Sequence, residues 1–335
     1  MYLDYRGFDL NNNFTSAYTA ASGSFPVKII KSLDLTTSVL KGNAILPLHI
    51  QLNPTNKCNL NCSFCSCSER DKKLELSLDE IKEIFDKFSD LGCRAVTITG
   101  GGEPLVHPNI EEIVEAAIER QISVGLVTNG KNIAKVSPDM FAMCTWVRIS
   151  VSNESPFDEF QISFMKANLQ AIKTDWSFSY VVTQNPDIDT ISGMIKFANS
   201  YKFTHVRIVN DIFKPVCDLD SVRRRIIKAK VDDNLVIWQD RRRYSVGFKK
   251  CHISLLKPVI GADGSIYPCC GAQYAESVPA HDYPRSMKMG DIWDITNIWD
   301  RQLVFDGSHC VKCYYEHYNY ALDALISDID HVEFV

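Results

Sequence analysis

The 335-residue sequence lacks any long hydrophobic run. A membrane-spanning helix needs about 18 or more consecutive apolar residues, and no stretch approaches that length, so we expect no membrane span. Residues 1–13 carry Asp4, Arg6 and Asp9 and no apolar run, so we expect no secretory signal peptide. Internal repeats and low-complexity tracts are also missing. These absences predict a cytoplasmic globular protein rather than a membrane, secreted or fibrous one.

Cysteine, by contrast, is plentiful. The chain has 12 cysteines, 45% hydrophobic residues and 23% charged residues. A core of this size needs no disulfides, and a cytoplasmic protein keeps its thiols reduced. We therefore interpret the cysteines as metal ligands or reactive thiols.

The net charge of −5 is unevenly distributed. Residues 223–250 contain ten Lys and Arg against three Asp, which gives this segment +7 and the rest of the chain −12. One interpretation is a solvated helix face followed by a charged hairpin. The other is a patch that attracts an anionic substrate or a polyanion.

Six predicted strands alternate with helices between residues 44 and 210. Leu78, Ile81, Ile84, Phe85 and Phe88 repeat with the helical period, and Ser77 with Glu80 predicts a capping box before them. The predicted strands are 46–52, 95–99, 122–128, 146–151, 178–183 and 206–209, and the predicted helices are 78–91, 109–121, 157–172 and 188–200. This alternation predicts an α/β fold with a parallel sheet, and six units are too few for a closed eight-stranded barrel. We expect an open, partial six-stranded barrel with its ligands at the carboxyl ends of the strands.

Three cysteines lie close together after the first predicted strand. Cys58, Cys62 and Cys65 form a C-x3-C-x2-C pattern within eight residues. Three thiolates can hold a [4Fe–4S] cluster and leave its fourth iron open for a substrate or cosubstrate. A zinc site with Cys67 as the fourth ligand remains an alternative.

This pattern, with Phe64 inside it, resembles the radical S-adenosylmethionine (radical SAM) superfamily. Two further motifs agree with the resemblance: Thr99-Gly100-Gly101-Gly102-Glu103-Pro104 after the second strand, and Thr128-Asn129-Gly130 after the third. Arg148-Ile149-Ser150-Val151 resembles the segment whose serine reaches the cosubstrate. The family commonly has Asp two residues after that serine, where this chain has Ser152. The resemblance implies SAM contacts from Phe64, Gly101, Gly102, Glu103, Asn129, Ser150 and Val209; Val209 is otherwise a plain core residue.

The resemblance also implies a reaction. SAM bound to the open iron is cleaved reductively, and the resulting 5′-deoxyadenosyl radical abstracts hydrogen from an unactivated C–H bond. An electron donor such as flavodoxin or ferredoxin is implied. The protein has to position that bond and exclude water.

A second set of cysteines occupies the last third of the chain. Cys251 is followed by a C-x12-G-x4-C pattern through Gly264 to Cys269, and later by Cys310-x2-Cys313. This set, with a predicted hairpin turning at Asp263-Gly264, resembles the twitch domain, a short form of the SPASM extension. The resemblance implies that Cys251, Cys269, Cys310 and Cys313 bind one auxiliary [4Fe–4S] cluster. The alternative is a structural zinc site with the same four ligands.

The resemblance therefore divides the chain into five parts. They are an N-terminal extension (1–43), the partial barrel (44–212), a basic connecting segment (213–250), the twitch domain (251–320) and a C-terminal tail (321–335). Among characterised types, the chain resembles 2-deoxy-scyllo-inosamine dehydrogenase and neomycin epimerase.

Several functions remain open from the sequence. We expect oxidation of an alcohol carbon in a polar small molecule, with the auxiliary cluster as electron acceptor. The first alternative is an epimerase in which Cys270 returns a hydrogen atom to the substrate radical, although Cys270 is also an alternative ligand to Cys269 or a buried thiol. A peptide-modifying enzyme is the second alternative. A metal-containing nucleic-acid-binding protein leaves the glycine motif unexplained, so we expect no nucleic-acid partner.

Overall fold

The computed structural model describes residues 29, 31–41, 44–211, 218–239, 247–271, 287–310, 313 and 315–327. Most of the predicted N-terminal extension and the last part of the tail lie outside these residues, as do Arg241, Arg242 and Arg243 of the basic segment. Within the described ranges, no helix is both long enough and apolar enough to cross a bilayer.

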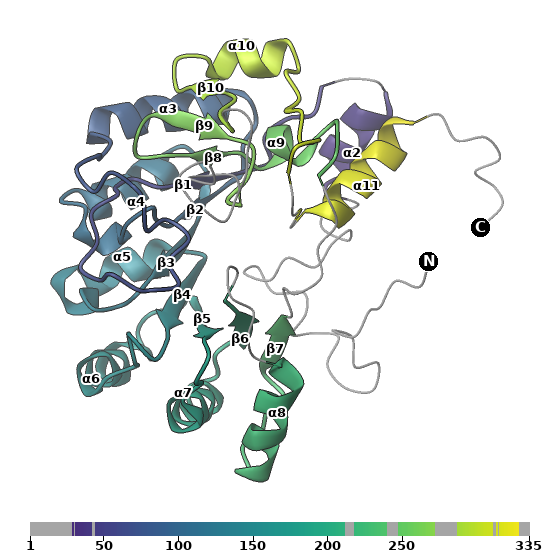
Figure 1. Ribbon diagram of the computed structural model, residues 1–335. Coiled ribbons are helices and arrows are strands. Elements are labelled where there is room, and N and C mark those ends of the chain that lie inside the picture. The colour runs from purple at the N-terminus through teal and green to yellow at the C-terminus, as the bar shows by residue number, and fades with distance from the viewer. Residues whose placement is uncertain are drawn as a thin grey trace.

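The described strands form one mixed sheet in the order β10-β9-β8-β1-β2-β3-β4-β5-β6-β7. Strands β1 to β7 are parallel and follow chain order, and their bounds are His49–Leu52, Ala95–Ile98, Ser123–Thr128, Trp146–Val151, Asp175–Val182, His205–Asn210 and Val236–Gln239. The sheet is curved and unclosed, with β10 and β7 at its edges (Figure 1). The predicted open parallel α/β architecture is confirmed.

The sheet is longer than the sequence predicts at both ends. Strand β7 lies in the segment predicted as a basic connector. It is a short edge strand whose residues are mostly half-buried, and charged residues precede and follow its short apolar run. At the other end, β8 (Val259–Ile260) pairs in parallel with β1, and β9 (Ser265–Tyr267) and β10 (Gly290–Asp291) add antiparallel strands. The cysteine-rich segment therefore continues the barrel sheet.

The predicted hairpin is present, but its connection is longer than two residues. Residues 261–264 join β8 to β9, and Gly264 has a φ of +72°, which favours glycine. The Gly261 amide donates to the Ser265 carbonyl at 2.9 Å. Asp263 and Gly264 are thus the last two residues of a four-residue turn.

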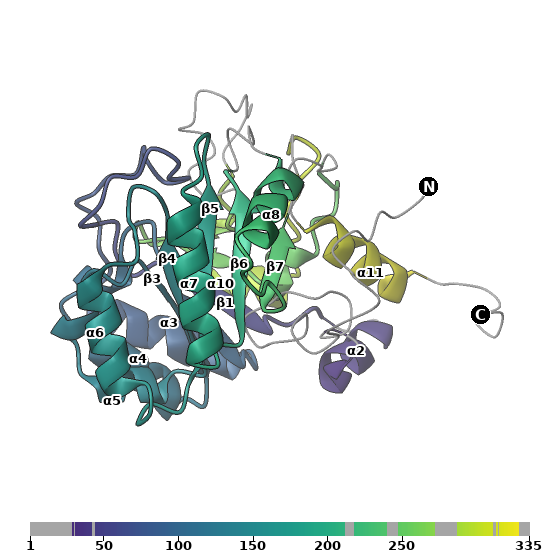
Figure 2. The same cartoon turned by 90° about the horizontal axis from the view of Figure 1, so that it is seen from below.

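Helices cover the convex side of the sheet (Figures 1 and 2). They are α3 (Leu78–Asp90), α4 (Ile110–Glu119), α5 (Pro138–Met143), α6 (Glu159–Asn168), α7 (Ile188–Ser200) and α8 (Leu219–Lys228). The predicted capping box of α3 is confirmed, because the Glu80 amide donates to Ser77 Oγ at 3.2 Å and the Ser77 amide donates to Glu80 Oε2 at 2.8 Å. Buried apolar residues from these helices and from alternate strand positions form one continuous core.

The C-terminal segments pack onto the start of the barrel. In α10 (Ile295–Asp300), the buried Trp299 ring lies edge-on to Phe88 of α3, with the ring centroids 5.1 Å apart. Helix α11 (Glu316–Ile326) contacts α2 (Leu33–Leu40). The short helix α9 (Ile253–Leu256) leads directly into β8. These contacts hold the second cysteine set against the barrel.

Candidate functional site

The first three cysteines lie in the loop between β1 and α3, at the carboxyl edge of the sheet. The glycine-rich loop after β2 packs directly on the start of this cysteine loop: the Gly102 amide donates to the Thr55 carbonyl at 2.9 Å, and the Glu103 amide donates to the Lys57 carbonyl at 2.8 Å. A Cβ atom on Gly102 would lie 1.9 Å from the Lys57 oxygen. Glycine is therefore required for this close approach.

Glu103 is buried and joins two loops. Its carboxylate accepts hydrogen bonds from the Leu105 amide at 3.1 Å, from the Asn129 amide at 2.7 Å, and from the Thr128 hydroxyl. Burial raises the pKa of Glu103, and these donors oppose that rise. The carboxylate is thus engaged in fixing the loop after β3 to the glycine loop.

Asn129 connects the third loop to the cysteine loop. Its side-chain Nδ2 donates to Asn59 Oδ1 at 2.7 Å, and its carbonyl accepts from Gln161 Nε2 at 2.9 Å. The structure therefore brings the loops after β1, β2 and β3 together, as the sequence predicts for residues at one edge of a parallel sheet.

The loop after β4 adds one residue, Glu154, that the sequence reasoning did not single out. Ser150 lies inside β4 and is half-buried, whereas Ser152 follows the end of the strand and accepts a hydrogen bond from the Ser155 amide at 3.1 Å. Two residues after Ser152, Glu154 accepts from the Ser63 amide at 2.8 Å, and so contacts the cysteine loop. The signal was present: a serine followed two residues later by an acid also fits Ser152 with Glu154.

Two apolar residues named from the sequence take different positions. Val209 of β6 is buried but lies apart from the main hydrophobic core, whereas its neighbour Ile208 is part of that core. Val209 therefore lies on the concave side of the sheet, where a ligand would lie. Phe64 is partly exposed within the cysteine loop, and Gly101 is buried beside Gly102.

The thiols of Cys58, Cys62 and Cys65 lie near one another. Burial, with contributions from the charges of Glu154, Cys65 and Cys58, raises the pKa of Cys62 to about 11. Cys65 has the opposite shift: hydrogen bonding from Cys67 lowers its pKa to about 6, with Arg70 contributing. Cys67 is buried and bonds to Cys65 through its side chain.

These thiols fit the donor set of a [4Fe–4S] cluster. Each cysteine of a cubane binds its own iron, so the thiols need not converge on one point. In the described part of the chain, no three His, Cys, Asp or Glu side chains are grouped as a site for a single metal ion. All three thiols are partly exposed at the open end of the barrel, where a cosubstrate could reach the fourth iron.

The second set comes from three segments of the chain, and Cys251 interacts with Cys310 and Cys313 of the last segment. Burial, with contributions from the Cys313 and Cys310 thiols, raises the pKa of Cys251 to about 12. Burial raises the pKa of Cys269, and the charges of Cys270, Cys251 and Cys310 also raise it. Mutually repelling buried thiolates are stabilised by bound metal, since metal binding displaces their protons. Met287 packs against Cys269 and Cys310 and closes one side of this group.

Cys270 has a hydrogen-bonding neighbour of its own. It is exposed, and its Sγ lies 3.3 Å from the Tyr315 hydroxyl. The ammonium of Lys257 lies above the Tyr315 ring, 5.7 Å from its centroid. Cys270, Tyr315 and Lys257 therefore form a separate polar group beside the second set.

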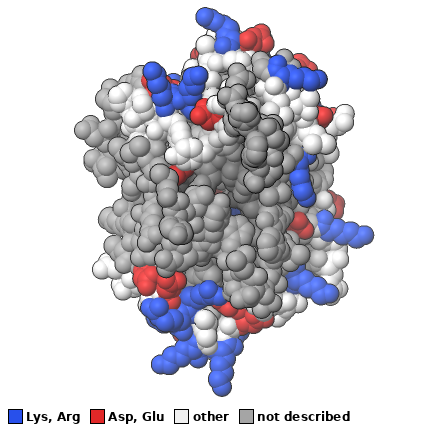
Figure 3. All heavy atoms as spheres, turned by 90° about the vertical axis from the view of Figure 1, so that its right-hand side faces the viewer, with Lys and Arg blue, Asp and Glu red and all other residues white. Residues whose placement is uncertain are grey.

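The described part of the basic segment lies mainly on the outside of the barrel. Arg224, Arg225 and Lys228 of α8 are exposed, and Arg223 pairs with Asp233 at 2.9 Å. Lys and Arg side chains gather at the lower end of the molecule, where α8 lies (Figure 3). These cations have the position of a solvated helix face, the first of the two interpretations of the segment.

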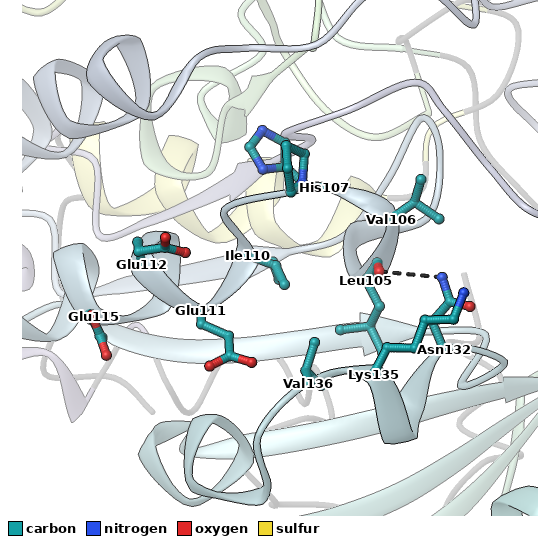
Figure 4. Close-up of a pocket in the computed structure, with 11 residues that line it drawn as sticks. Leu105, Val106, His107, Ile110, Glu111, Glu112, Glu115, Asn132, Lys135 and Val136 are labelled. Atoms are coloured by element: carbon teal, nitrogen blue, oxygen red, sulfur yellow. Dashed lines mark hydrogen bonds between the residues drawn. The ribbon is translucent and has the colours of Figure 1, made fainter.

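A surface pocket of about 650 Å³ lies on the outer side of the glycine loop (Figure 4). Leu105, His107 and residues of α4 and of the segment after β3 line it, and Glu111, Glu112 and Glu115 give it an acidic wall. His107 is occupied locally, because its ring bonds to the Leu76 carbonyl at 2.9 Å and to the Asn109 amide at 3.1 Å. No cysteine lines this pocket, so we do not assign it to the reaction.

Comparisons with known proteins agree with the motifs. Residues 52–179 match the family model of the Radical SAM superfamily. GTP 3′,8-cyclase of Desulforamulus reducens is 36% identical over 101 residues, which is 28% of this chain and 30% of the relative. The subtilosin biosynthesis protein AlbA of Bacillus subtilis is 33% identical over 96 residues, 28% of this chain and 21% of the relative. The chain thus spans less than a third of the length of either relative.

Solved structures show the same fold. Streptococcus suis SuiB bound to S-adenosylmethionine superimposes with a TM-score of 0.57 at 18% identity, covering 84% of this chain and 72% of that one. Native anSMEcpe with bound AdoMet and Cp18Cys peptide gives a TM-score of 0.51 at 14% identity, covering 86% of both chains. The matched residues hold the three cysteines, the glycine motif and Asn129. Residues 52–179 therefore belong to the radical SAM superfamily.

Proposed function

We propose that this chain oxidises an alcohol carbon of a polar small molecule by radical chemistry. The cofactors of the superfamily are S-adenosylmethionine and one [4Fe–4S] cluster, and we assign that cluster to Cys58, Cys62 and Cys65. A second cluster on Cys251, Cys269, Cys310 and Cys313 is part of the proposal. When bound, these groups would supply a hydrogen-abstracting 5′-deoxyadenosyl radical and an acceptor for the remaining electron.

The proximity of the four later cysteines carries the proposal. They come from three separate segments. Cys310 and Cys313 lie near enough to Cys251 to raise its pKa, and Cys251 and Cys310 do the same to Cys269. A radical on a carbon that bears a hydroxyl group becomes a ketone by losing one electron and the hydroxyl proton. An auxiliary cluster beside the barrel would accept that electron, and an enzyme with only the first cluster has no such acceptor.

The chain's own residues would position both reactants. Gly102 and the loop it supports leave backbone oxygens close to the cysteine loop, where a methionine ammonium needs acceptors. Asn129 and either Ser150 or Ser152 lie at the carboxyl edge of the sheet. Val209 offers an apolar surface on the concave side for adenine. We also propose that a small flavoprotein or ferredoxin-type donor supplies the reducing electron.

Iron analysis and product stoichiometry test this proposal. Anaerobically reconstituted protein should contain about eight irons per chain, and the Cys58→Ala/Cys62→Ala/Cys65→Ala variant about four. The variant should form no 5′-deoxyadenosine and keep the spectrum of the second cluster. Oxidation predicts one 5′-deoxyadenosine per ketone. About four irons in the wild-type chain, or zinc at the second set, would contradict the proposal.

Epimerisation is a second candidate, and the position of Cys270 favours it. This thiol is exposed, lies outside the group of four, and contacts Tyr315. A thiol that is not tied to metal can return a hydrogen atom to a substrate radical. Turnover in deuterated water separates the two reactions, since an epimerase incorporates one solvent deuterium at the inverted carbon and an oxidase yields a ketone.

Peptide modification is a third candidate. AlbA acts in the biosynthesis of a bacteriocin, and SuiB has been solved with a precursor peptide. The similarity to AlbA covers only 28% of this chain and 21% of AlbA, so it supports the radical chemistry more than the substrate. Incubation with candidate peptides under the same conditions tests this candidate by mass change.

A further inference from the structure

A buried glutamine of α6 connects the start of that helix to the loop after β3. Gln161 is 1% exposed, and a buried side-chain amide has to satisfy both its acceptor and its donor. Its Oε1 accepts from the Asp158 amide at 3.0 Å, which is half of the capping box of α6, and from Lys131 Nζ at 3.4 Å. Its Nε2 donates to the Asn129 carbonyl at 2.9 Å. The acceptor of this side chain therefore caps the helix, and its donor holds the loop.

The loop after β3 is shaped to fit this glutamine. Gly130 has a φ of +71°, a conformation that favours glycine, and a Cβ atom on it would lie 2.5 Å from Gln161 Nε2. The next residue, Lys131, donates from Nζ to Asp158 Oδ2 at 2.6 Å and to the Pro156 carbonyl at 2.7 Å. Three successive loop residues are thus fitted to the start of α6.

Asn129 extends these contacts to the first cysteine set. Its Oδ1 accepts from the Lys131 amide at 2.9 Å, and its Nδ2 donates to Asn59 Oδ1 at 2.7 Å. Asn59 follows Cys58 directly, and its Oδ1 lies 4.0 Å from Cys58 Sγ. The same sulfur accepts from the Leu60 amide at 3.4 Å. A continuous series of hydrogen bonds therefore joins α6 to the turn that carries Cys58.

We propose that Gln161 is a positioning residue for the first cluster: through Asn129 it holds the Cys58 turn in the conformation that binds SAM. The inference rests on the proposed function only in assigning the first cluster to Cys58, and it holds for any substrate. The Asn129 amide also donates to the Glu103 carboxylate at 2.7 Å, so the same residue ties the glycine loop into this arrangement. Loops that are ordered beforehand lose less conformational freedom when a ligand binds, and this raises the affinity.

Helix capping and loop positioning use different atoms of Gln161, so two substitutions separate them. Gln161→Glu keeps an oxygen that accepts from the Asp158 amide, but it replaces the donor to the Asn129 carbonyl with an oxygen that repels it. Asp158→Ala is the matched control. It removes the carboxylate that accepts from the Gln161 amide at 3.0 Å and leaves the bond from Gln161 to Asn129 in place.

Hydrogen exchange in the metal-free, full-length protein tests these contacts without any cofactor. The amides of Asn129, Gly130 and Lys131 are each bonded to a side-chain oxygen. Gln161→Glu should speed amide exchange in peptides spanning 58–61 and 128–131 about tenfold, because the loops open more easily once this bond is lost. Asp158→Ala should lower the melting temperature by a few degrees through loss of the cap, and leave exchange in these peptides unchanged.

Equilibrium dialysis of radiolabelled SAM against the anaerobically reconstituted protein measures the consequence for the site. Gln161→Glu should bind SAM about tenfold more weakly than the wild type at equal iron content, whereas Asp158→Ala should bind it equally well. The double variant Asn129→Ala/Gln161→Glu should bind SAM no more weakly than Asn129→Ala. Once the Asn129 side chain is gone, Gln161 has nothing left to position.

Unchanged SAM affinity or unchanged loop exchange in Gln161→Glu would overturn the inference. Additive losses in the double variant would also overturn it, since Gln161 would then act by another route. An equal loss of SAM affinity in Asp158→Ala would assign the effect to helix stability instead. Failure of the proposed function looks different, because wild-type protein would then bind no SAM, while loop exchange in the metal-free protein would still depend on Gln161.

Discussion

The guanidinium group of Arg70 donates a hydrogen bond to the Cys65 thiol, with Nη1 3.6 Å from Sγ. Arg70 is buried, and it also donates to the Asn56 carbonyl from Nε at 2.8 Å and to the Cys67 carbonyl from Nη1 at 2.5 Å. A cation is thus fixed beside one ligand of the first cysteine set. Hydrogen bonds and charge near the sulfurs set the potential of an iron–sulfur cluster.

We predict that Arg70→Met lowers the reduction potential of the first cluster. The substitution removes a positive charge and a hydrogen-bond donor to Cys65. Both groups stabilise the more negative, reduced state of the cluster, so their removal lowers the potential. Lys72→Met is the matched control, since Lys72 is an exposed cation of the same loop that bonds only to Asn61 at 3.0 Å. An anaerobic redox titration followed by electron paramagnetic resonance measures the shift. Equal potentials in the wild type and Arg70→Met, at equal iron content, would rule the idea out.

We predict that Cys65 is the most reactive thiol of the first set in the metal-free protein. The hydrogen bond from Cys67 lowers the pKa of Cys65 to about 6, so the thiolate predominates above that pH, whereas Cys62, with a pKa of about 11, stays protonated at neutral pH. Brief alkylation by iodoacetamide at pH 7 should label Cys65 at least about tenfold more than Cys62.

Acidification and mutation check the cause of this reactivity. Labelling of Cys65 should fall as the pH drops below about 6, because the thiol becomes protonated. Cys67→Ala removes the main donor, so it should raise the pKa of Cys65 and slow labelling at pH 7. Peptide mass spectrometry quantifies each site, and equal labelling of Cys62 and Cys65 is the outcome that contradicts the prediction.

We predict that Gly102→Ala prevents stable assembly of the first cluster. The added Cβ would lie 1.9 Å from the Lys57 carbonyl, so the cysteine loop has to move. Overpacking of this kind costs about 1–3 kcal/mol of unfolding free energy. Gly193→Ala in α7 is the control, because nothing lies within 4 Å of its added Cβ and alanine favours a helix. Urea unfolding and iron content measure both effects, and a Gly102→Ala protein with full iron would show that the loop tolerates the methyl group.

The sequence predicts the parallel sheet and the clustering of motifs because both depend on local periodicity and on chain order. Ser77 and Glu80 form their cap, and the loops carrying Gly102 and Asn129 meet the cysteine loop. Long-range pairing is harder to predict. Nothing in the sequence near Val259 indicates that it pairs with Gln51, about 200 residues earlier.

Positions near a strand end are sensitive to register. The sequence motif suggests Ser150 as the residue that reaches the cosubstrate, but Ser150 lies within β4 and Ser152 lies just past its end. A two-residue shift keeps a side chain on the same face, so the polar pattern alone cannot choose between them. Glu154 could not be identified from the sequence, because its contact with Ser63 forms only when the loop is folded.

The last prediction concerns Cys269 and Cys270, which are adjacent in the chain but have different surroundings. Cys269 interacts with Cys251 and Cys310, whereas Cys270 contacts the Tyr315 hydroxyl at 3.3 Å. We therefore predict that Cys269→Ser loses the auxiliary cluster, with about four irons lost per chain, and that Cys270→Ser keeps it. If the enzyme is an epimerase, Cys270→Ser should still cleave SAM but form little epimer; if it oxidises an alcohol, the variant should keep most of its ketone formation. Tyr315→Phe removes the hydroxyl beside Cys270 without touching a ligand, so it should leave the iron content unchanged. Loss of the auxiliary cluster in Cys270→Ser, with Cys269→Ser intact, would reverse the assignment of the two cysteines.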